Sequence, residues 1–287
     1  MVSSKALTRR NPIKYFFFYG KKMAHKNEKT QHMYIRQMSF SDIFPNIMNF
    51  DKEGQGGHKI VIIGKPGTGK STFIKHLMYV KRRFIPAVVA MNGTEQSSQF
   101  YGNHVPKAFV YNGYDEGAAK NIVERQQKAR GKLKNPWLMA IVDDCTEDPK
   151  VLNTPVFHDI FKNGRHYKML FVLSLQYALD IKPGVRACID IVVIFRESRE
   201  DARKKLYVNF ASVIGNYSTF CSVMDALTGN HTALVINNTI DSNEPSDCVF
   251  YMRVDKPDDK PFHMGSYETR KHSSNRISAD LASTVAN

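Results

Sequence analysis

The most constraining feature of the chain is the segment Val61–Thr72, which reads VIIGKPGTGKST. It contains the pattern G-x-x-x-x-G-K-[ST] and follows the β-branched run Lys59–Ile63. This pattern, placed between a strand and a helix, is the phosphate-binding loop of P-loop nucleoside triphosphatases, also called Walker A. We expect it to bind nucleotide through Gly64, Lys65, Pro66, Gly67, Thr68, Gly69, Lys70, Ser71 and Thr72. The segment therefore predicts a nucleotide site inside an α/β fold.

Each residue type in the loop has a physical role. Glycines lack a Cβ, so consecutive backbone N–H groups can turn toward the β- and γ-phosphates. Lys70 would bring a positive charge to the same oxygens. Ser71 opens the following helix, whose positive end attracts phosphate, and its hydroxyl would bind Mg²⁺.

Strand-like and helix-like segments alternate along the chain. Apolar, β-branched runs predict strands at 59–63, 87–91, 108–111, 137–142, 168–175, 189–195, 232–236 and 249–254. The last two are expected at the sheet edge. Helices are expected at 71–81, 115–130, 154–162, 198–210, where Ser198 and Asp201 would form a capping box, and up to about Ala226. This alternation predicts a mostly parallel sheet with helices on both faces.

The length of 287 residues favours one main domain with extensions. We expect a basic N-terminal extension over 1–57, the ATPase domain over 58–255, and a disordered tail over 256–287 that is rich in Pro, Ser and mixed charge.

The formal net charge of +14 predicts a polyanionic partner. Residues 1–40 contribute +8 of this charge, from nine Lys or Arg against Glu28. These cations could contact nucleic acid or form a solvated arm. They are Lys5, Arg9, Arg10, Lys14, Lys21, Lys22, Lys26, Lys29 and Arg36.

Cysteine spacing and hydropathy exclude several classes of protein. The four cysteines form no C-x-x-C pair, which argues against a zinc site and a disulfide framework. No apolar run approaches the ~18 residues that a membrane span needs. We therefore expect a soluble, intracellular protein.

Acidic and polar side chains follow the later strands. Asp143 and Asp144 directly follow the strand 137–142, where a Walker B strand places its acids. Asp143 would hold Mg²⁺ and Asp144 would activate the attacking water, with Glu147 as the rival base. The next strand ends at Gln176, which would approach the γ-phosphate if this strand lies between the other two. Arg165, in the preceding turn, is a candidate arginine finger.

The motifs GKPGTGKST, IVDDC, NGRHYK and SLQY, in this order and spacing, resemble the genome-packaging ATPases of nucleocytoplasmic large DNA viruses, including the poxvirus type. These ATPases belong to the FtsK–HerA superfamily, and the resemblance covers about residues 58–237. It implies a RecA-like (ASCE-type) core, Mg²⁺ and ATP, a homo-oligomeric ring around double-stranded DNA, and delivery of the genome into a preformed capsid. It also implies that Gln176 senses the γ-phosphate and that Arg165 reaches a neighbouring subunit.

Other functions fit the sequence less well. A hexameric helicase acting on single strands would share the same core and stays open. A small-molecule kinase would need an Arg-rich lid, which is not evident, and a GTPase would need an N-K-x-D motif, which the chain lacks. A two-domain helicase would need a longer chain. A DNA-binding protein without catalysis would leave Lys70, Ser71 and Asp143 without a role.

Overall fold

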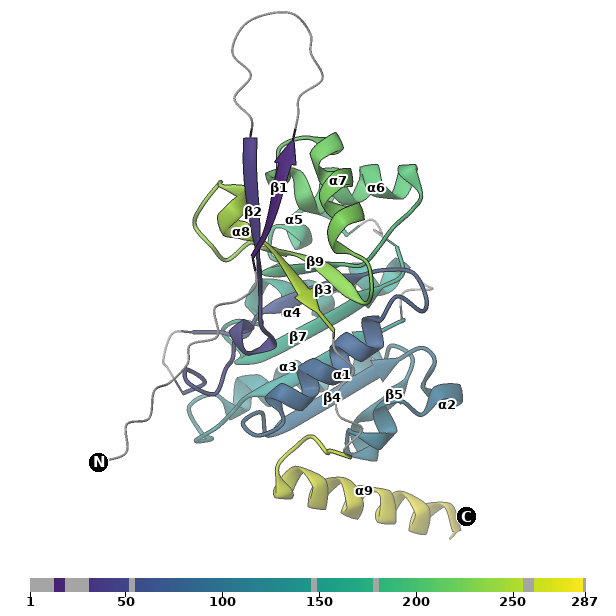
Figure 1. The fold of residues 1–287 in the computed structure, drawn as a ribbon. Helices are drawn as coiled ribbons and strands as arrows, with labels where there is room; N and C mark the ends of the chain where they lie inside the picture. The colour runs from purple at the N-terminus through teal and green to yellow at the C-terminus, as the bar shows by residue number, and fades with distance from the viewer. Residues whose placement is uncertain are drawn as a thin grey trace, which may run out of the picture.

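The computed structural model describes residues 13–18, 31–51, 55–145, 149–177, 181–254 and 261–285. In these residues one ten-stranded sheet runs through the molecule in the order β1-β2-β10-β9-β8-β3-β7-β6-β4-β5 (Figure 1). The strands are β1 Ile13–Phe18, β2 Gln31–Gln37, β3 Lys59–Ile63, β4 Ala87–Asn92, β5 Val110–Asn112, β6 Leu138–Asp143, β7 Met169–Leu175, β8 Ile191–Ile194, β9 Thr232–Asn237 and β10 Val249–Arg253. The predicted strands all form.

The six strands from β8 to β5 are parallel to one another. β9 runs antiparallel to both β8 and β10, and β2 pairs in parallel with β10. The β1–β2 hairpin therefore extends the sheet, and part of the N-terminal extension belongs to it. We expected the late strands β9 and β10 at the sheet edge, but they lie inside the sheet because this hairpin covers them.

Helices cover both faces of the sheet. The helices are α1 Lys70–Lys81, α2 Glu95–Ser98, α3 Glu116–Ala129, α4 Pro155–Asn163, α5 Pro183–Arg186, α6 Glu200–Leu206, α7 Tyr217–Leu227, α8 Pro245–Cys248 and α9 Tyr267–Val285. One apolar cluster joins α3, α4 and α7 to one face, and a second joins α1 to the other. Along β3 the side chains alternate between them, with Val61 in the first and Ile62 in the second. This confirms the predicted α/β architecture. Among the described helices, none is both long enough and apolar enough to cross a membrane.

The C-terminal tail corrects one prediction. We expected 256–287 to be disordered, but Tyr267–Val285 form α9, which lies at the bottom of Figure 1. Tertiary hydrogen bonds hold this polar helix. Thr269 Oγ1 donates to the carbonyl of Pro86 at 2.8 Å, and the buried Ser273 Oγ accepts from the backbone N–H of Ala108 at 3.1 Å. Composition gave no sign of these contacts, since their partners lie more than 160 residues away in the sequence.

The helix after β8 also differs from its prediction. Ser198 does not cap it: α6 begins at Glu200, its N-cap residue is Arg199, and no side chain caps it. The Ser198 hydroxyl instead accepts a hydrogen bond from Lys65 Nζ at 3.1 Å. The hydroxyl that the local pattern predicted as a helix cap is thus hydrogen-bonded to a lysine of the phosphate-binding loop.

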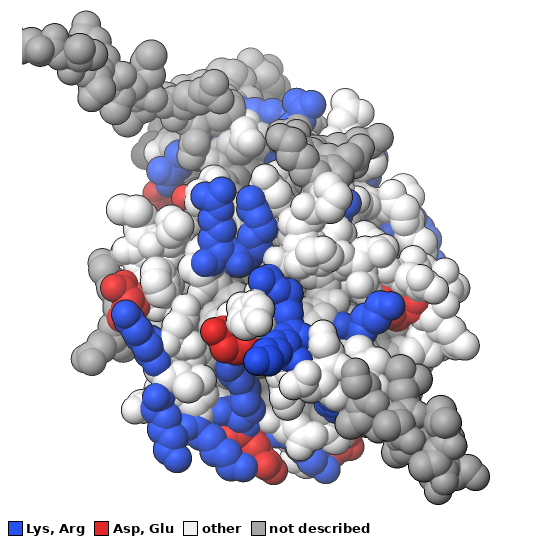
Figure 2. Space-filling model, turned by 90° about the horizontal axis from the view of Figure 1, so that it is seen from below, with Lys and Arg blue, Asp and Glu red and all other residues white. Residues whose placement is uncertain are grey.

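Positive charge is not limited to the N-terminal residues. On the face seen from below, Figure 2 shows more Lys and Arg side chains than Asp and Glu side chains. The folded domain itself therefore offers a basic surface.

Candidate nucleotide site

The phosphate-binding loop connects β3 to α1 at the carboxyl edge of the parallel strands. Gly67 and Gly69 have φ values of +77° and +108°, a region that residues with a Cβ rarely adopt. The backbone N–H of Gly64 donates to the carbonyl of Leu175 at 3.1 Å, which ties the start of the loop to the end of β7. No side chain caps α1, so its first N–H groups stay available for phosphate. The predicted strand, loop and helix are confirmed.

Lys70 lies inside the curve of this loop. Its Nζ donates to the carbonyl of Gly64 at 2.7 Å and to that of Lys65 at 3.1 Å. An ammonium group has three N–H donors, so one is left for a phosphate oxygen. Burial lowers the pKa of Lys70, and the charges of Asp143 and Asp144 oppose this shift.

Asp143 ends β6 and is almost fully buried. Its Oδ2 accepts a hydrogen bond from the Tyr101 hydroxyl at 2.7 Å and lies 3.4 Å from Ser71 Oγ, which also donates to it. The two predicted metal ligands, Ser71 and Asp143, thus lie together. Burial, followed by the charge of Asp143, raises the pKa of Tyr101 well above its usual value, so Tyr101 stays a neutral donor.

Asp144 and Gln176 contact each other across two strand ends. Gln176 Nε2 donates to Asp144 Oδ1. This contact exists because β7 lies between β3 and β6, which is the arrangement that the expected role of Gln176 required. Asp144 has φ +51°, a backbone conformation that Asp tolerates better than most residues. Glu147, the rival base, lies outside the described residues.

These side chains line one cavity of about 240 Å³. Of the predicted site residues it brings together Pro66, Gly67, Lys70, Ser71, Asp143, Asp144 and Gln176. Lys65 does not line the cavity and pairs instead with Glu197, in the segment after β8, at 2.7 Å. Thr72 follows Ser71 in α1 and does not line the cavity.

The remaining lining residues come from the last residue of β4 and the segment after it, which carried no recognisable motif. They are Asn92, Thr94, Ser98 and Phe100. Glu95 holds this segment in place, because its carboxylate accepts from Asn92 Nδ2 at 2.8 Å and from the backbone N–H of Tyr101 at 3.1 Å. Gly93 is needed here: a Cβ at this position would lie 2.0 Å from the carbonyl oxygen of Asp144. The register between β4 and β6 explains why this segment lies beside the acids of the site, since Asn92 pairs with Asp143.

Arg165 is not near this cavity. It lies in the turn between α4 and β7, at the amino edge of the sheet, and its guanidinium forms an ion pair with the buried Asp190. Asp190 also accepts from the backbone N–H of Lys59 at 2.8 Å. Arg165 therefore cannot reach the nucleotide of its own chain, and a role in a neighbouring subunit stays a prediction.

Comparison with known proteins agrees with this geometry. The family model described as Poxvirus A32 protein matches residues 48–260. The uncharacterized protein 088R of Invertebrate iridescent virus 3 is 48% identical over 220 residues, which cover 77% of this chain and 84% of that protein. The uncharacterized protein 075L of Invertebrate iridescent virus 6 is 41% identical over 241 residues, covering 83% of this chain and 93% of that protein.

Among solved structures, the DNA-packaging ATPase B204 of Sulfolobus turreted icosahedral virus has a similar fold. It aligns with a TM-score of 0.51 and 18% identity, over 68% of this chain and 96% of its own. The family match covers well over half of the sequence and spans every strand of the nucleotide site. The chain therefore belongs to the family of the Poxvirus A32 protein.

Proposed function

We propose that this chain is the ATP-hydrolysing motor that moves double-stranded viral DNA into a preformed capsid. One observation carries the catalytic part of the proposal: Lys70, Ser71, Asp143, Asp144 and Gln176 come from three strand ends and line a single cavity. The family assignment and the packaging ATPase fold support the choice of process and argue against a small-molecule kinase.

The site fits Mg²⁺ bound to the phosphates of ATP. Hard oxygen ligands suit this ion, and Ser71 Oγ and Asp143 Oδ2 lie close enough to share it with phosphate oxygens. When bound, Mg²⁺ would offset the negative charge of the β- and γ-phosphates. Tyr101 orients the Asp143 carboxylate by donating a hydrogen bond to Oδ2, and Oδ1 takes no part in this bond.

The remaining residues of the site would act on the attacking water and on the γ-phosphate. Asp144 would accept a proton from the attacking water, and Gln176, which donates to it, would hold its carboxylate in place and sense the γ-phosphate. Lys70 would neutralise phosphate charge, and Arg165 of a neighbouring subunit would do so from outside. The proposal therefore includes a homo-oligomeric ring that acts with capsid proteins in the host cytoplasm.

Nucleic-acid dependence of ATP turnover tests the proposal. We expect turnover by the full chain to rise several-fold with long duplex DNA and less with single strands of equal length, while Lys70→Ala stays inactive. A third strand bound as a triplex at the duplex end should be displaced only when ATP is hydrolysed. A preference for single strands would instead identify a helicase-like ATPase, and phosphorylation of an added nucleoside would identify a kinase.

A further inference from the structure

A second, larger cavity lies at the amino edge of the sheet, away from the nucleotide site. This amino-edge groove has a volume of about 1040 Å³. It is lined by residues that precede β3 and β7, such as His58 and Lys168, by the segment that follows α3, and by Lys162 in the last turn of α4. Because β3 and β7 start here and end at the nucleotide cavity, a ligand in the groove would leave that cavity open.

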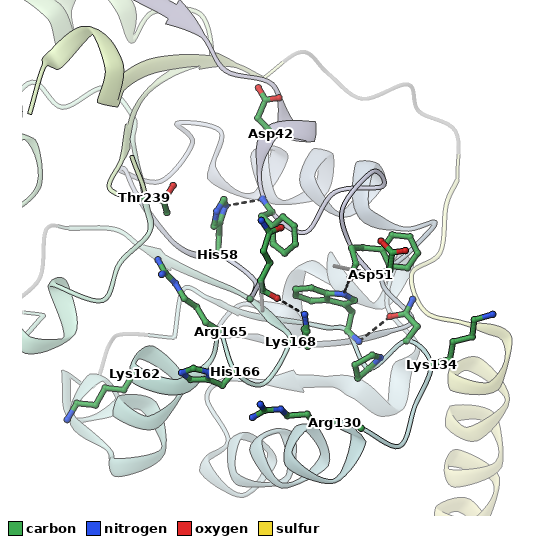
Figure 3. Close-up of a pocket in the computed structure, with 18 of the residues that line it drawn as sticks. Asp42, Asp51, His58, Arg130, Lys134, Lys162, Arg165, His166, Lys168 and Thr239 are labelled. Atoms are coloured by element: carbon green, nitrogen blue, oxygen red, sulfur yellow. Dashed lines mark hydrogen bonds between the residues drawn. The ribbon is translucent and has the colours of Figure 1, made fainter. Parts of the chain in front are cut away.

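The groove is strongly basic. Its lining includes five Lys or Arg residues against two carboxylates. The basic residues are Arg130, Lys134, Lys162, Arg165 and Lys168, and the acidic ones are Asp42 and Asp51. Figure 3 shows these side chains spread around the groove instead of meeting at one point. Such a spread suits a polymer that presents phosphates at several positions more than it suits a single small anion.

Three of the five cations have no carboxylate partner among the described residues. Arg165 pairs with Asp190, and Lys168 Nζ donates to the carbonyl of Gln55 at 2.6 Å. Arg130, Lys134 and Lys162 are exposed, and among the described residues none of them forms an ion pair with a carboxylate. Their charge is therefore available to a ligand.

The aromatic residues of the groove indicate which form of nucleic acid it suits. Sites for single strands stack bases on exposed aromatic rings. Here Trp137 is 1% exposed and Phe44 is 9% exposed, so neither offers a free face. Phe50, the third aromatic residue in the lining, packs against Phe84. Among the described Phe and Trp residues of the lining, none is exposed, whereas the three unpaired cations are, and this favours contacts to a duplex backbone.

His58 adds a neutral donor to these charges. Its Nδ1 accepts the backbone N–H of Phe44 at 2.9 Å, as Figure 3 shows. The neutral imidazole therefore carries its proton on Nε2, which can donate to a phosphate oxygen.

We propose that the amino-edge groove binds the phosphates of duplex DNA through Arg130, Lys134 and Lys162. The proposal rests on the proposed packaging function. Arg165 also lines the groove, but it is not included in the proposal because its guanidinium is paired with Asp190.

Binding of a fluorescent 30-bp duplex by the full chain, measured by anisotropy at several salt concentrations, tests this inference. The test variant is Arg130→Gln/Lys134→Gln/Lys162→Gln. The matched control is Arg83→Gln/Lys107→Gln/Lys205→Gln, which removes the same charge from exposed positions outside the groove. Arg165 stays intact in both. Both variants should keep the thermal unfolding midpoint and the assembly state of the wild type, measured by light scattering.

We expect the test variant to bind duplex DNA about 10- to 100-fold more weakly near physiological salt, and its slope of log affinity against log salt to fall by about 2.7, since each phosphate contact contributes about 0.9. The control should keep the wild-type slope. If the two variants bind duplex DNA with equal affinity and equal salt dependence, the groove assignment is overturned. Duplex binding by the wild type would in that case still support the proposed function. Loss of assembly in the test variant alone would assign these cations to subunit contacts and also overturn it. A wild type that binds no duplex would instead overturn the proposed function.

Discussion

The two edges of the central sheet use their polar side chains in opposite ways. At the carboxyl edge, side chains from β3, β6 and β7 converge, and hydrogen bonds link Ser71 and Tyr101 to Asp143 and Gln176 to Asp144. At the amino edge, Arg130, Lys134 and Lys162 are spread around a wide groove without a described carboxylate partner. Catalysis needs groups held in one geometry, whereas a charged polymer is bound by charges distributed along it.

Arg165 offers the strongest test of how the two edges are related. If Arg165 of one subunit completes the nucleotide site of the next, Arg165→Ala should lower turnover by ~10³ or more, because its guanidinium offsets charge on the γ-phosphoryl group. Subunits carrying Arg165→Ala and subunits carrying Lys70→Ala should each be inactive alone. A mixture should regain ATP turnover at interfaces that pair an intact site with an intact Arg165.

The control for this experiment is proof that mixed rings form, for example by energy transfer between labelled subunits. If mixed rings form and stay inactive, the amino edge does not serve the neighbouring nucleotide site. Arg199 would then be the next candidate, because it lies at the carboxyl edge and its contact with Asp201 is long, at 3.8 Å. Arg196 and Arg203 both pair with Asp225.

Asp144 tests whether the carboxyl edge contains the base. Asp144→Asn preserves the shape of the side chain and the oxygen that accepts from Gln176, but the amide cannot take a proton from water. We expect ATP binding to stay near normal and turnover to fall by ~10²–10⁴. Measured binding of an ATP analogue and steady-state turnover separate the two effects. The same phenotype in Glu147→Gln, with an active Asp144→Asn, would transfer the role to Glu147.

Tyr101 tests whether the geometry of Asp143 depends on its buried hydrogen bond. Tyr101→Phe removes only the hydroxyl that donates to Asp143 at 2.7 Å. Groups that orient a metal ligand typically contribute 10- to 100-fold to metal affinity or activity, so we expect the half-saturating Mg²⁺ concentration to rise by about that factor. Tyr111→Phe, which removes a hydroxyl outside the cavity, is the matched control. An unchanged Mg²⁺ dependence in Tyr101→Phe would show that Asp143 is held by other contacts.

His58 affects the stability of the amino edge and leaves the residues of the nucleotide cavity unchanged. Burial lowers the pKa of His58 from 6.5 to about 4, with the charge of Asp190 opposing the shift and those of Arg165, Lys81 and Lys59 adding to it. The unfolded chain therefore binds more protons than the folded chain between these pH values, and stability falls as pH drops from about 6.5 to 4. The loss is at most about 3 kcal/mol.

His58→Asn keeps an acceptor for the Phe44 N–H and removes this titration. The difference in unfolding free energy between wild type and variant, measured by urea denaturation, should shift in favour of the variant as pH falls through this window and stay constant above pH 7. A constant difference at every pH would contradict the neutral state of His58 in the folded protein.

Local sequence patterns were sufficient to predict those parts of the site that each lie within one chain segment. The phosphate-binding loop, the acids after β6 and the Gln after β7 were all predicted, because each is a short motif next to an apolar strand. Tyr101, Gly93 and the support from Glu95 were not predictable, since their roles depend on the pairing of Asn92 with Asp143. Register between strands is a property of the folded sheet, and no single segment encodes it.

The sequence by itself determined the class of the fold, the position of the nucleotide loop and the polar residues at the ends of the strands. Periodicity and glycine placement act over a few residues, so one chain segment contains the whole signal. Only the tertiary structure decided that Arg165 lies across the sheet from its own nucleotide site, that the tail folds as α9, and that scattered cations share one groove. These outcomes depend on contacts between residues far apart in the chain. Such contacts form only when the strands pair and the helices pack against the sheet.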